Sequence, residues 1–322
     1  MKKRIAILGG GESGVGAALL AMAKGMDVFV SDKGKIEQKY KYELEENSIS
    51  YEEGVHTEAL ILNADVIVKS PGIPDKAELI QTLIKNNKQI ISEIEFASEF
   101  TKAKFIGITG SNGKTTTTLL TYHLLKKSGL NVGLAGNIGY SLARQVIEDK
   151  FEYYVLELSS FQLDGVYKFK AHLAVLLNIT PDHLDRYEYK FENYVESKFR
   201  ITKNQSPEEY FIYNADDPVI VERLANIKTS PQLLGISLNK EIENGAYKAD
   251  QTLLFNISGN LKASFKIDID QIPLKGRHNM INTMAALLAG AALGIDPSGF
   301  LNAIKDFKNV SHRLEDAGGI GE

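Results

Sequence analysis

Two glycine-rich segments of the chain have the residue types and spacing of phosphate-binding loops. The first, ILGGGESGVG at 7–16, contains a GxGxxG pattern that starts at Gly9, and Asp32 follows about 20 residues further on. The second, GITGSNGKTTTT at 107–118, carries a lysine and a threonine directly after its last glycine. A chain with two such loops is expected to bind two different phosphate-bearing molecules.

The first loop has the sequence context of a dinucleotide fingerprint. An apolar run at 4–8 predicts a buried strand before it, and the pattern at 15–24 predicts a helix after it. The glycines would let the backbone approach a diphosphate at the helix N-terminus, and Asp32 would be available to a ribose. The same pattern also occurs in turns that bind nothing, and it does not separate NAD from a nucleoside-diphosphate sugar.

The second loop resembles a P-loop but departs from the strict spacing. Five residues rather than four separate Gly107 from Gly113. The chemistry is still available, because Lys114 can reach terminal phosphates and Thr115 can offer a hydroxyl to magnesium. The alternative is a glycine turn with a lysine in the first helical turn.

A carboxylate and a histidine follow two predicted strands of this second region. Glu157 is the next-to-last residue of the apolar segment 151–158, where a buried charge needs a partner such as a metal ion or local hydrogen bonds. His183 follows the strand predicted at 172–179 and would reach the same metal, although a lone histidine is more often structural or at the surface.

Lys198 lies on the apolar face of a predicted helix. Phe191, Tyr194 and Val195 form an i, i+3, i+4 stripe, and Lys198 occupies position i+7. Such a lysine either extends outward to water or loses its charge. A neutral ε-amine could react with CO₂ to give a carbamate, which would supply oxygen ligands to magnesium.

Composition excludes several classes of protein. The chain has 322 residues, a formal net charge of −4 and no cysteine, so a basic nucleic-acid binder and thiolate metal sites are excluded. No apolar run is long enough to span a bilayer or serve as a signal peptide. We therefore expect a soluble cytoplasmic protein without membrane contact, and a monomer.

The alternation of predicted strands and helices indicates an α/β fold with two domains. We expect a Rossmann-like N-terminal domain at 1–96, a larger P-loop-type α/β ATPase domain at 97–310, and the start of a C-terminal domain at 311–322. The other predicted elements are strands at 26–32, 64–69, 104–109 and 209–214, helices at 114–128 and 280–294, and an antiparallel hairpin at 252–269 with its turn at 258–260.

Six motifs together resemble the Mur ligases of peptidoglycan precursor synthesis, from residue 4 to about residue 315. They are GITGSNGKTTT, ELSSFQL, NITPDHLDRY, the lysine in YVESKFRI, GRHNMINTMAA and HRLE. Within the family, ELSSFQL and SPGI favour the member that joins D-glutamate to UDP-N-acetylmuramoyl-L-alanine over ligases for folates or later peptide steps.

The resemblance implies a role for each motif residue, with Lys114, Glu157, His183, Lys198 and Arg313 as the catalytic set. Residues implied to contact the UDP-sugar are Gly11, Glu12, Ser13, Asp32, Ser70, Gly72, Asn137 and Ser159. Residues implied to bind ATP are Gly110, Ser111, Asn112, Gly113, Lys114, Thr115, Thr116, Asn279, Asn282 and Arg313. Two magnesium ions are implied on Thr115, Glu157, His183 and carbamylated Lys198.

The implied reaction is amide-bond formation through an acyl phosphate, driven by ATP. Family members carry a third domain after HRLE, whereas this chain ends at Glu322. We therefore expect a truncated or naturally short form that binds the UDP-sugar but lacks the amino-acid pocket and shows little ligase turnover. Two alternatives are an NAD(P) oxidoreductase, which leaves Lys114 without a role, and a non-catalytic nucleotide-binding protein, against which the metal-ligand set argues.

Overall fold

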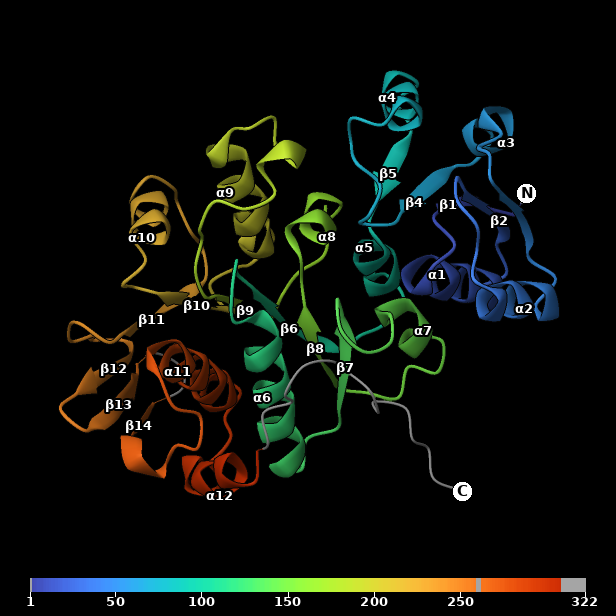
Figure 1. Ribbon diagram of the computed structural model, residues 1–322. Coiled ribbons are helices and arrows are strands. Elements are labelled where there is room, and N and C mark those ends of the chain that lie inside the picture. The colour runs from blue at the N-terminus through green and yellow to red at the C-terminus, as the bar shows by residue number, and fades with distance from the viewer. Residues whose placement is uncertain (1, 259–261, 308–322) are drawn as a thin grey trace.

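The structure is a computed structural model that describes residues 2–258 and 262–307 (Figure 1). The predicted turn residues Gly259 and Asn260, the predicted ATP contact Arg313 and the predicted C-terminal start at 311–322 lie outside the described residues. Within those residues, no helix combines the length and apolar character needed to cross a membrane.

The N-terminal domain is built on a parallel sheet with strand order β3-β2-β1-β4-β5. Its central strands are apolar because helices cover both faces of the sheet. The strand order reverses between β1 and β4, and ligands bind at such a switch point in open α/β sheets. The elements are β1 (Arg4–Leu8), α1 (Glu12–Ala23), β2 (Asp27–Asp32), α2 (Gln38–Glu46), β3 (Ser50–Glu53), α3 (Glu58–Leu62), β4 (Val66–Lys69), α4 (Glu78–Lys85) and β5 (Gln89–Ile91).

The short helix α5 (Glu93–Ser98) connects the two sheets, and the predicted domain boundary after residue 96 falls inside it. Ser92 caps this helix by accepting the Glu95 N–H at 3.2 Å. The buried Glu95 carboxylate accepts N–H groups from three successive residues of the central domain, Tyr167, Lys168 and Phe169, at 2.8–3.0 Å. The connecting helix is therefore bonded to the central domain.

The central domain has a mixed sheet with order β14-β13-β12-β11-β10-β9-β6-β8-β7. In this order, every neighbouring pair from β12 to β7, including both pairs of β6, is parallel. The pairs β12–β13 and β13–β14 are antiparallel. Its strands are β6 (Lys104–Thr109), β7 (Val132–Gly136), β8 (Tyr153–Glu157), β9 (Leu173–Leu176), β10 (Tyr210–Asn214), β11 (Gln232–Ser237), β12 (Gly245–Ala249), β13 (Thr252–Ile257) and β14 (Ala263–Asp268). Its helices are α6 (Lys114–Lys127), α7 (Leu142–Val146), α8 (Ser160–Asp164), α9 (Phe191–Phe199), α10 (Pro218–Ala225), α11 (Arg277–Ala292) and α12 (Phe300–Lys305), with 3₁₀ turns at Leu184–Arg186, Arg200–Thr202, Ile269–Gln271 and Pro297–Gly299.

Most predicted elements occur with small shifts at their ends. The predicted strand at 151–158 shortens to β8, and the helix predicted at 280–294 begins earlier, at Arg277. The predicted hairpin forms and extends the large sheet through β12. Sequence analysis missed β7, whose sequence VGLAG has two glycines and lacks the alternation of a typical strand.

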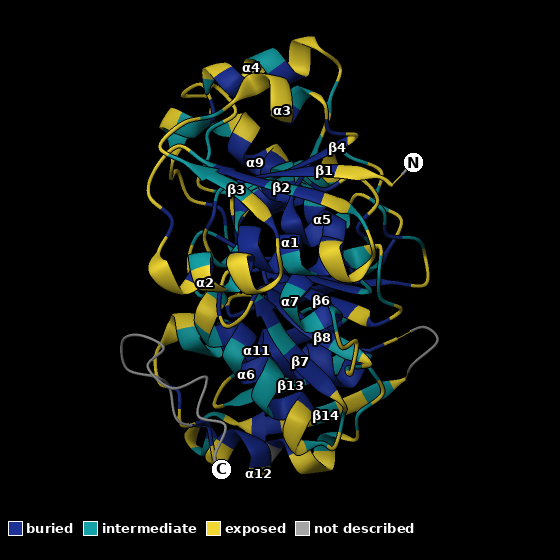
Figure 2. Cartoon of the chain, turned by 90° about the vertical axis from the view of Figure 1, so that its right-hand side faces the viewer, coloured by how far each residue is buried: buried dark blue, intermediate teal, exposed yellow. Residues whose placement is uncertain are grey.

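An apolar core runs without interruption from the N-terminal sheet into the central domain. Buried side chains of β1, α1 and α5 belong to the same cluster as those of α7, β6 and β8, and Figure 2 shows this dark-blue zone between the two sheets. The contact between α1 and α7 is close, because a Cβ on Gly16 would lie 2.0 Å from Ser141 Oγ. A second cluster lies under α6 and α11, and a third under α3 and α4.

Candidate active site

The second glycine loop joins β6 to α6 and is fixed by neighbouring polar groups. Gly113 precedes α6 with φ +85°, a left-handed conformation that favours glycine. A Cβ there would lie 2.6 Å from Asn282 Oδ1. The Ser111 and Asn112 N–H groups donate to the carbonyl and side-chain oxygens of Asn178 at 2.9 and 2.8 Å. The first turn of α6 leaves its own N–H groups without helical partners, so it presents donors to an anion.

Two lysines converge on one carbonyl oxygen of this loop. Lys114 Nζ donates to the carbonyls of Gly110 at 2.9 Å and Ser111 at 3.0 Å, and Lys198 Nζ also donates to Gly110 at 2.9 Å. Lys198 is 2% exposed, so its side chain does not extend to water. Burial, and secondarily the Lys114 ammonium, lowers the pKa of Lys198 to about 7. Near neutral pH a large fraction of this amine is therefore uncharged and nucleophilic.

The Glu157 carboxylate lies at the end of β8 and is buried at 2% exposure. Its Oε2 accepts the Thr115 hydroxyl at 2.8 Å, and its Oε1 accepts the Asn137 side-chain amide at 2.8 Å. Both donors are neutral, and among the described residues no lysine, arginine or histidine forms an ion pair with Glu157. A buried carboxylate held by neutral donors favours a cation beside it.

The donor set around Glu157 fits magnesium. A carboxylate and the Thr115 hydroxyl are hard oxygen donors, and protein-bound magnesium commonly uses one or two carboxylates together with substrate phosphates. In the part of the chain that the structure describes, no three His, Asp or Glu side chains gather as a metal cluster. Phosphate oxygens of a nucleotide would therefore have to complete the coordination.

His183 lies at the start of the turn at Leu184–Arg186, with φ +50°. Its side chain is 52% exposed, and Nε2 lies 3.5 Å from Asp182 Oδ2. Its ring packs beside Phe161 with centroids 5.1 Å apart. Within residues 2–258 and 262–307 it forms no hydrogen bond to Glu157 or Lys198, so its role as a metal ligand stays a prediction.

A cavity of about 330 Å³ lies beside the second loop, where α11 meets the ends of β9, β10 and β11. Asn282 is 5% exposed, and its Nδ2 donates to Asn279 Oδ1 at 3.3 Å. Thr116 lies in the first turn of α6 and is half-buried. Sequence analysis gave no role to the other polar residues of this cavity: three lie within the quoted motifs NITPDHLDRY and GRHNMINTMAA, and three follow or end β10 and β11 without a motif. They are Asn178, Asn214, Asp216, Asn239, Arg277 and His278.

Asp32 holds the first glycine loop in place, because both of its carboxylate oxygens accept backbone N–H groups. Asp32 accepts the Gly10 N–H at 2.6 Å through Oδ2 and the Gly34 N–H at 2.7 Å through Oδ1. A Cβ on Gly14 would lie 1.8 Å from the Gly9 carbonyl oxygen, so the third glycine is needed for the turn to close. A cavity of about 570 Å³ opens beside this loop and extends to His56 beyond β3.

The Ser70-Pro71-Gly72 turn lies against the first loop and is clamped by the other domain. The Ser70 N–H donates to the Leu8 carbonyl at 2.9 Å. Arg186 of the central domain donates to the carbonyls of Pro71, Gly72 and Ile73 at 3.1–3.3 Å. Sequence analysis missed this clamp, which joins residues more than one hundred positions apart.

Glu12 bonds to the central domain, and its predicted contact with the UDP-sugar stays a prediction. Its Oε1 accepts the Ser141 N–H at 3.0 Å and Arg144 Nε at 3.1 Å. Gly11 and Ser13 stand on either side of it at the start of α1, Gly11 exposed and Ser13 half-buried.

Ser159 serves as the N-cap of α8. Its hydroxyl accepts the Gln162 N–H at 3.3 Å, and Gln162 Oε1 in turn accepts the Ser159 N–H at 3.0 Å. This reciprocal capping box uses the polar atoms of ELSSFQL for local structure. Contact of Ser159 with a substrate stays a prediction.

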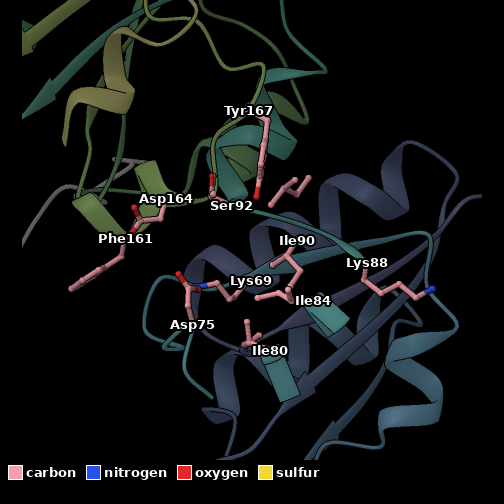
Figure 3. Close-up of a pocket in the computed structure, with 12 residues that line it drawn as sticks. Lys69, Asp75, Ile80, Ile84, Lys88, Ile90, Ser92, Phe161, Asp164 and Tyr167 are labelled. Atoms are coloured by element: carbon pink, nitrogen blue, oxygen red, sulfur yellow. The ribbon is translucent and has the colours of Figure 1, made fainter. Parts of the chain in front are cut away.

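A further cavity of about 300 Å³ lies between the two domains (Figure 3). Lys69 of the N-terminal domain pairs with Asp75 at 2.9 Å. Asp164 and Phe161 line the facing wall from α8. Burial raises the pKa of Asp164, which accepts the Tyr187 hydroxyl at 2.9 Å.

Each of the two domains matches a known protein family. Residues 108–290 match the family model of the Mur ligase middle domain, and residues 4–79 match that of the MurD N-terminal domain. The chain belongs to the Mur ligase family, as the motifs predicted.

Two similar curated relatives carry the name UDP-N-acetylmuramoylalanine–D-glutamate ligase. The Porphyromonas gingivalis W83 protein is 54% identical over 316 residues, and the Christiangramia forsetii protein is 51% identical over 315 residues. Each alignment covers 98% of this chain and 70% of the relative.

Solved structures of lower identity share the fold. The UDP-N-acetylmuramate:L-alanyl-gamma-D-glutamyl-meso-diaminopimelate ligase from Neisseria meningitides superposes with TM-score 0.66 at 21% identity, covering 97% of this chain and 100% of that chain. UDP-N-acetylmuramate-alanine ligase from Thermotoga maritima gives TM-score 0.55 at 20% identity, covering 94% and 68%. The predicted α/β fold class is confirmed.

Proposed function

We propose that this chain carries the UDP-sugar and nucleotide sites of a ligase that joins D-glutamate to UDP-N-acetylmuramoyl-L-alanine with ATP. The observation that carries the proposal is the pair of strand–glycine loop–helix units, β1–α1 and β6–α6, on two domains that share one core. An ATP-dependent enzyme with a nucleotide-linked substrate needs two phosphate sites, and the names of the relatives specify the same chemistry.

In the proposed reaction the alanyl carboxylate attacks the γ-phosphorus of ATP, which forms an acyl phosphate and releases ADP. The amine of D-glutamate then attacks the acyl carbon, loses a proton, and phosphate leaves with the bonding electrons. The contribution of the chain is placement and charge neutralisation. Lys114 and the N–H groups at the start of α6 would hold the terminal phosphates, and the first loop would hold the UDP-sugar.

Glu157 and Thr115 would hold magnesium, which neutralises developing phosphate charge when bound. The Asn137 amide donates to one oxygen of Glu157, and that oxygen keeps a second lone pair that a cation could use. A second ion on His183 and Lys198 is part of the proposal.

Lys198 would contribute to that second site as a carbamate. Its uncharged amine nitrogen would attack the carbon of CO₂, and the proton released would leave a carbamate anion. The buried position and the lowered pKa of Lys198 support the free amine that this step requires.

Calorimetric titration tests the assignment of the first loop. We expect saturable binding of UDP-N-acetylmuramoyl-L-alanine to the chain and no binding of NADH. Binding of NADH alone would contradict the proposal. A Lys114→Met variant serves as the matched control, because it should lose binding of a non-hydrolysable ATP analogue and keep binding of the UDP-sugar.

A further inference from the structure

The segment between β7 and α7, residues 136–141, touches both phosphate-binding regions. One of its ends bonds to Glu157 beside the second loop, and its other end bonds to Glu12 at the first loop. Neither contact is predicted by a sequence motif. In Figure 1 this segment and α7 lie between β7 of the central domain and α1 of the N-terminal domain.

The end near the nucleotide region is held by both backbone and side chain. The Asn137 N–H donates to the Glu157 carbonyl at 2.8 Å, and its side-chain amide donates to Glu157 Oε1 at 2.8 Å. Gly136 has φ +102°, and a Cβ there would lie 2.2 Å from the same carbonyl oxygen. This end of the segment therefore follows any movement of β8 at Glu157.

The other end is held by a charged pair across the domain boundary. Arg144 Nε donates to Glu12 Oε1 at 3.1 Å, and a second guanidinium nitrogen donates to Glu12 Oε2 at 3.3 Å. Glu12 Oε1 also accepts the Ser141 N–H, and Arg144 pairs with Glu43 as well. The side chains of Arg144 and Glu12 are 23% and 30% exposed, and two-pronged pairs of this kind hold a defined geometry better than surface pairs do.

Each ligand would change a hydrogen bond at its own end of the segment. A cation at Glu157 draws charge from the carboxylate oxygen that accepts the Asn137 amide, which weakens that hydrogen bond. A diphosphate at the start of α1 places negative charge beside Glu12 and competes with this carboxylate for the Arg144 guanidinium, which weakens that pair. Each ligand thus loosens the segment, and the ligand that binds second meets a smaller cost. The two ligands thus act on one short stretch of backbone that is closely packed between two domains.

We propose that residues 136–141 couple the two sites, so that the nucleotide with its cation and the UDP-sugar each strengthen binding of the other. Asn137 within the segment and Arg144, which lies just beyond it in α7, are the positioning residues. The inference rests on the proposed function, because it requires both ligands to bind this chain.

Calorimetry measures the coupling as a ratio of dissociation constants. The affinity for UDP-N-acetylmuramoyl-L-alanine is determined with and without saturating magnesium and a non-hydrolysable ATP analogue, and the reciprocal pair is measured as a check on linkage. We expect at least about a fivefold gain in the unaltered chain, at the lower end of typical couplings. Asn137→Ala and Arg144→Met should each reduce the gain to less than about twofold.

Glu43→Gln is the matched control, because it removes one partner of Arg144 and leaves the bond to Glu12 intact. This variant should keep the coupling of the unaltered chain. Asn137 is exposed, so its substitution tests the coupling without disturbing the domain interface. Unfolding midpoints of all variants are compared in parallel.

Three outcomes overturn the inference in distinguishable ways. Binding of both ligands to the unaltered chain without any gain overturns the coupling and leaves the proposed function standing. A full gain in both Asn137→Ala and Arg144→Met overturns the assignment to this segment. Failure of the unaltered chain to bind the UDP-sugar overturns the proposed function together with the inference.

Discussion

Glu93 is a buried carboxyl group whose ionisation is expected to control stability near neutral pH. One oxygen accepts the Ala143 N–H at 2.5 Å, and the other is buried without a partner in the described residues. Burial raises the pKa of Glu93 to about 7, against an unfolded value near 4.5. The folded chain therefore binds more protons than the unfolded chain between these values, and stability falls as pH rises from about 4.5 through about 7.

Glu93→Gln should remove this loss, because an amide is neutral at every pH in this range. Between pH 5 and pH 8.5 the unaltered chain should lose up to about 3 kcal/mol of unfolding free energy through this group. The Glu93→Gln variant should not show that loss. Urea denaturation at the two pH values measures the difference. The exposed Glu46→Gln variant is the control, and an equal pH dependence in Glu93→Gln and the unaltered chain would contradict the prediction.

Lys198 provides a second prediction at the scale of a single side chain. Incubation with ¹³C-bicarbonate should give a carbamate carbon signal in the NMR spectrum, because about half of the buried amine is uncharged near pH 7. Lys198→Met should lose the signal, and Lys203→Met, which changes an exposed lysine on the same segment, should keep it. A signal that persists in Lys198→Met would assign the carbamate elsewhere.

Among elements, α6 is flanked by two glycines with matching backbone conformations. Gly113 and Gly129 have φ +85° and +84°, so alanine at either position should cost about 1–2 kcal/mol of unfolding free energy. A Cβ at Gly113 also meets Asn282 Oδ1 at 2.6 Å, whereas a Cβ at Gly129 has no heavy atom within 4 Å.

Gly113→Ala should therefore weaken binding of an ATP analogue by about tenfold or more, and Gly129→Ala should leave that binding unchanged. Calorimetry and urea denaturation of the two variants separate the backbone effect from the effect on the site. Equal losses of affinity in both variants would mean that helix stability, rather than the shape of the loop, controls nucleotide binding.

The turn that carries Arg186 offers a prediction for the facing domain. Arg186 donates to three carbonyl oxygens of residues 71–73, and hydrogen bonds from a charged donor contribute about 1.5–3 kcal/mol. Arg186→Met should weaken UDP-sugar binding by about tenfold or more and leave binding of the ATP analogue unchanged. Lys76→Met, which removes a single donor to the Asp185 carbonyl across the same boundary, is the control. Unchanged UDP-sugar affinity in Arg186→Met would contradict the role of the clamp.

Local sequence patterns predicted the parts of the site that depend on neighbours along the chain. The GxGxxG pattern marks the first loop, and the stripe ending at Lys198 marks a buried amine. The Glu12–Arg144 pair joins positions 132 residues apart, so no local pattern could indicate it. Asp32 has the position expected of a ribose ligand, but its two bonds to backbone N–H groups depend on how the loops fold together.

At the scale of the whole molecule, the shared core predicts that both domains unfold together. The cluster that includes Val15 and Ala18 of the N-terminal domain also includes Leu142 and Leu156 of the central domain. Scanning calorimetry should show a single transition, with the calorimetric enthalpy close to the van't Hoff enthalpy. The UDP-sugar should shift that whole transition upward. Two separate transitions would indicate that the interface contributes little to stability.

The convergence of Lys114 and Lys198 on the Gly110 carbonyl has a practical consequence. Two ammonium groups within 2.9 Å of one oxygen create a concentrated positive field at the start of α6. Sulfate or phosphate in a buffer would gather there as counter-ions and compete with any nucleotide. The competition weakens above about pH 7, where Lys198 loses its proton. In phosphate buffer at pH 6.5, the measured nucleotide affinity would therefore include the displacement of bound phosphate. In a buffer with a large organic ion at pH 8, it would report binding of the nucleotide alone.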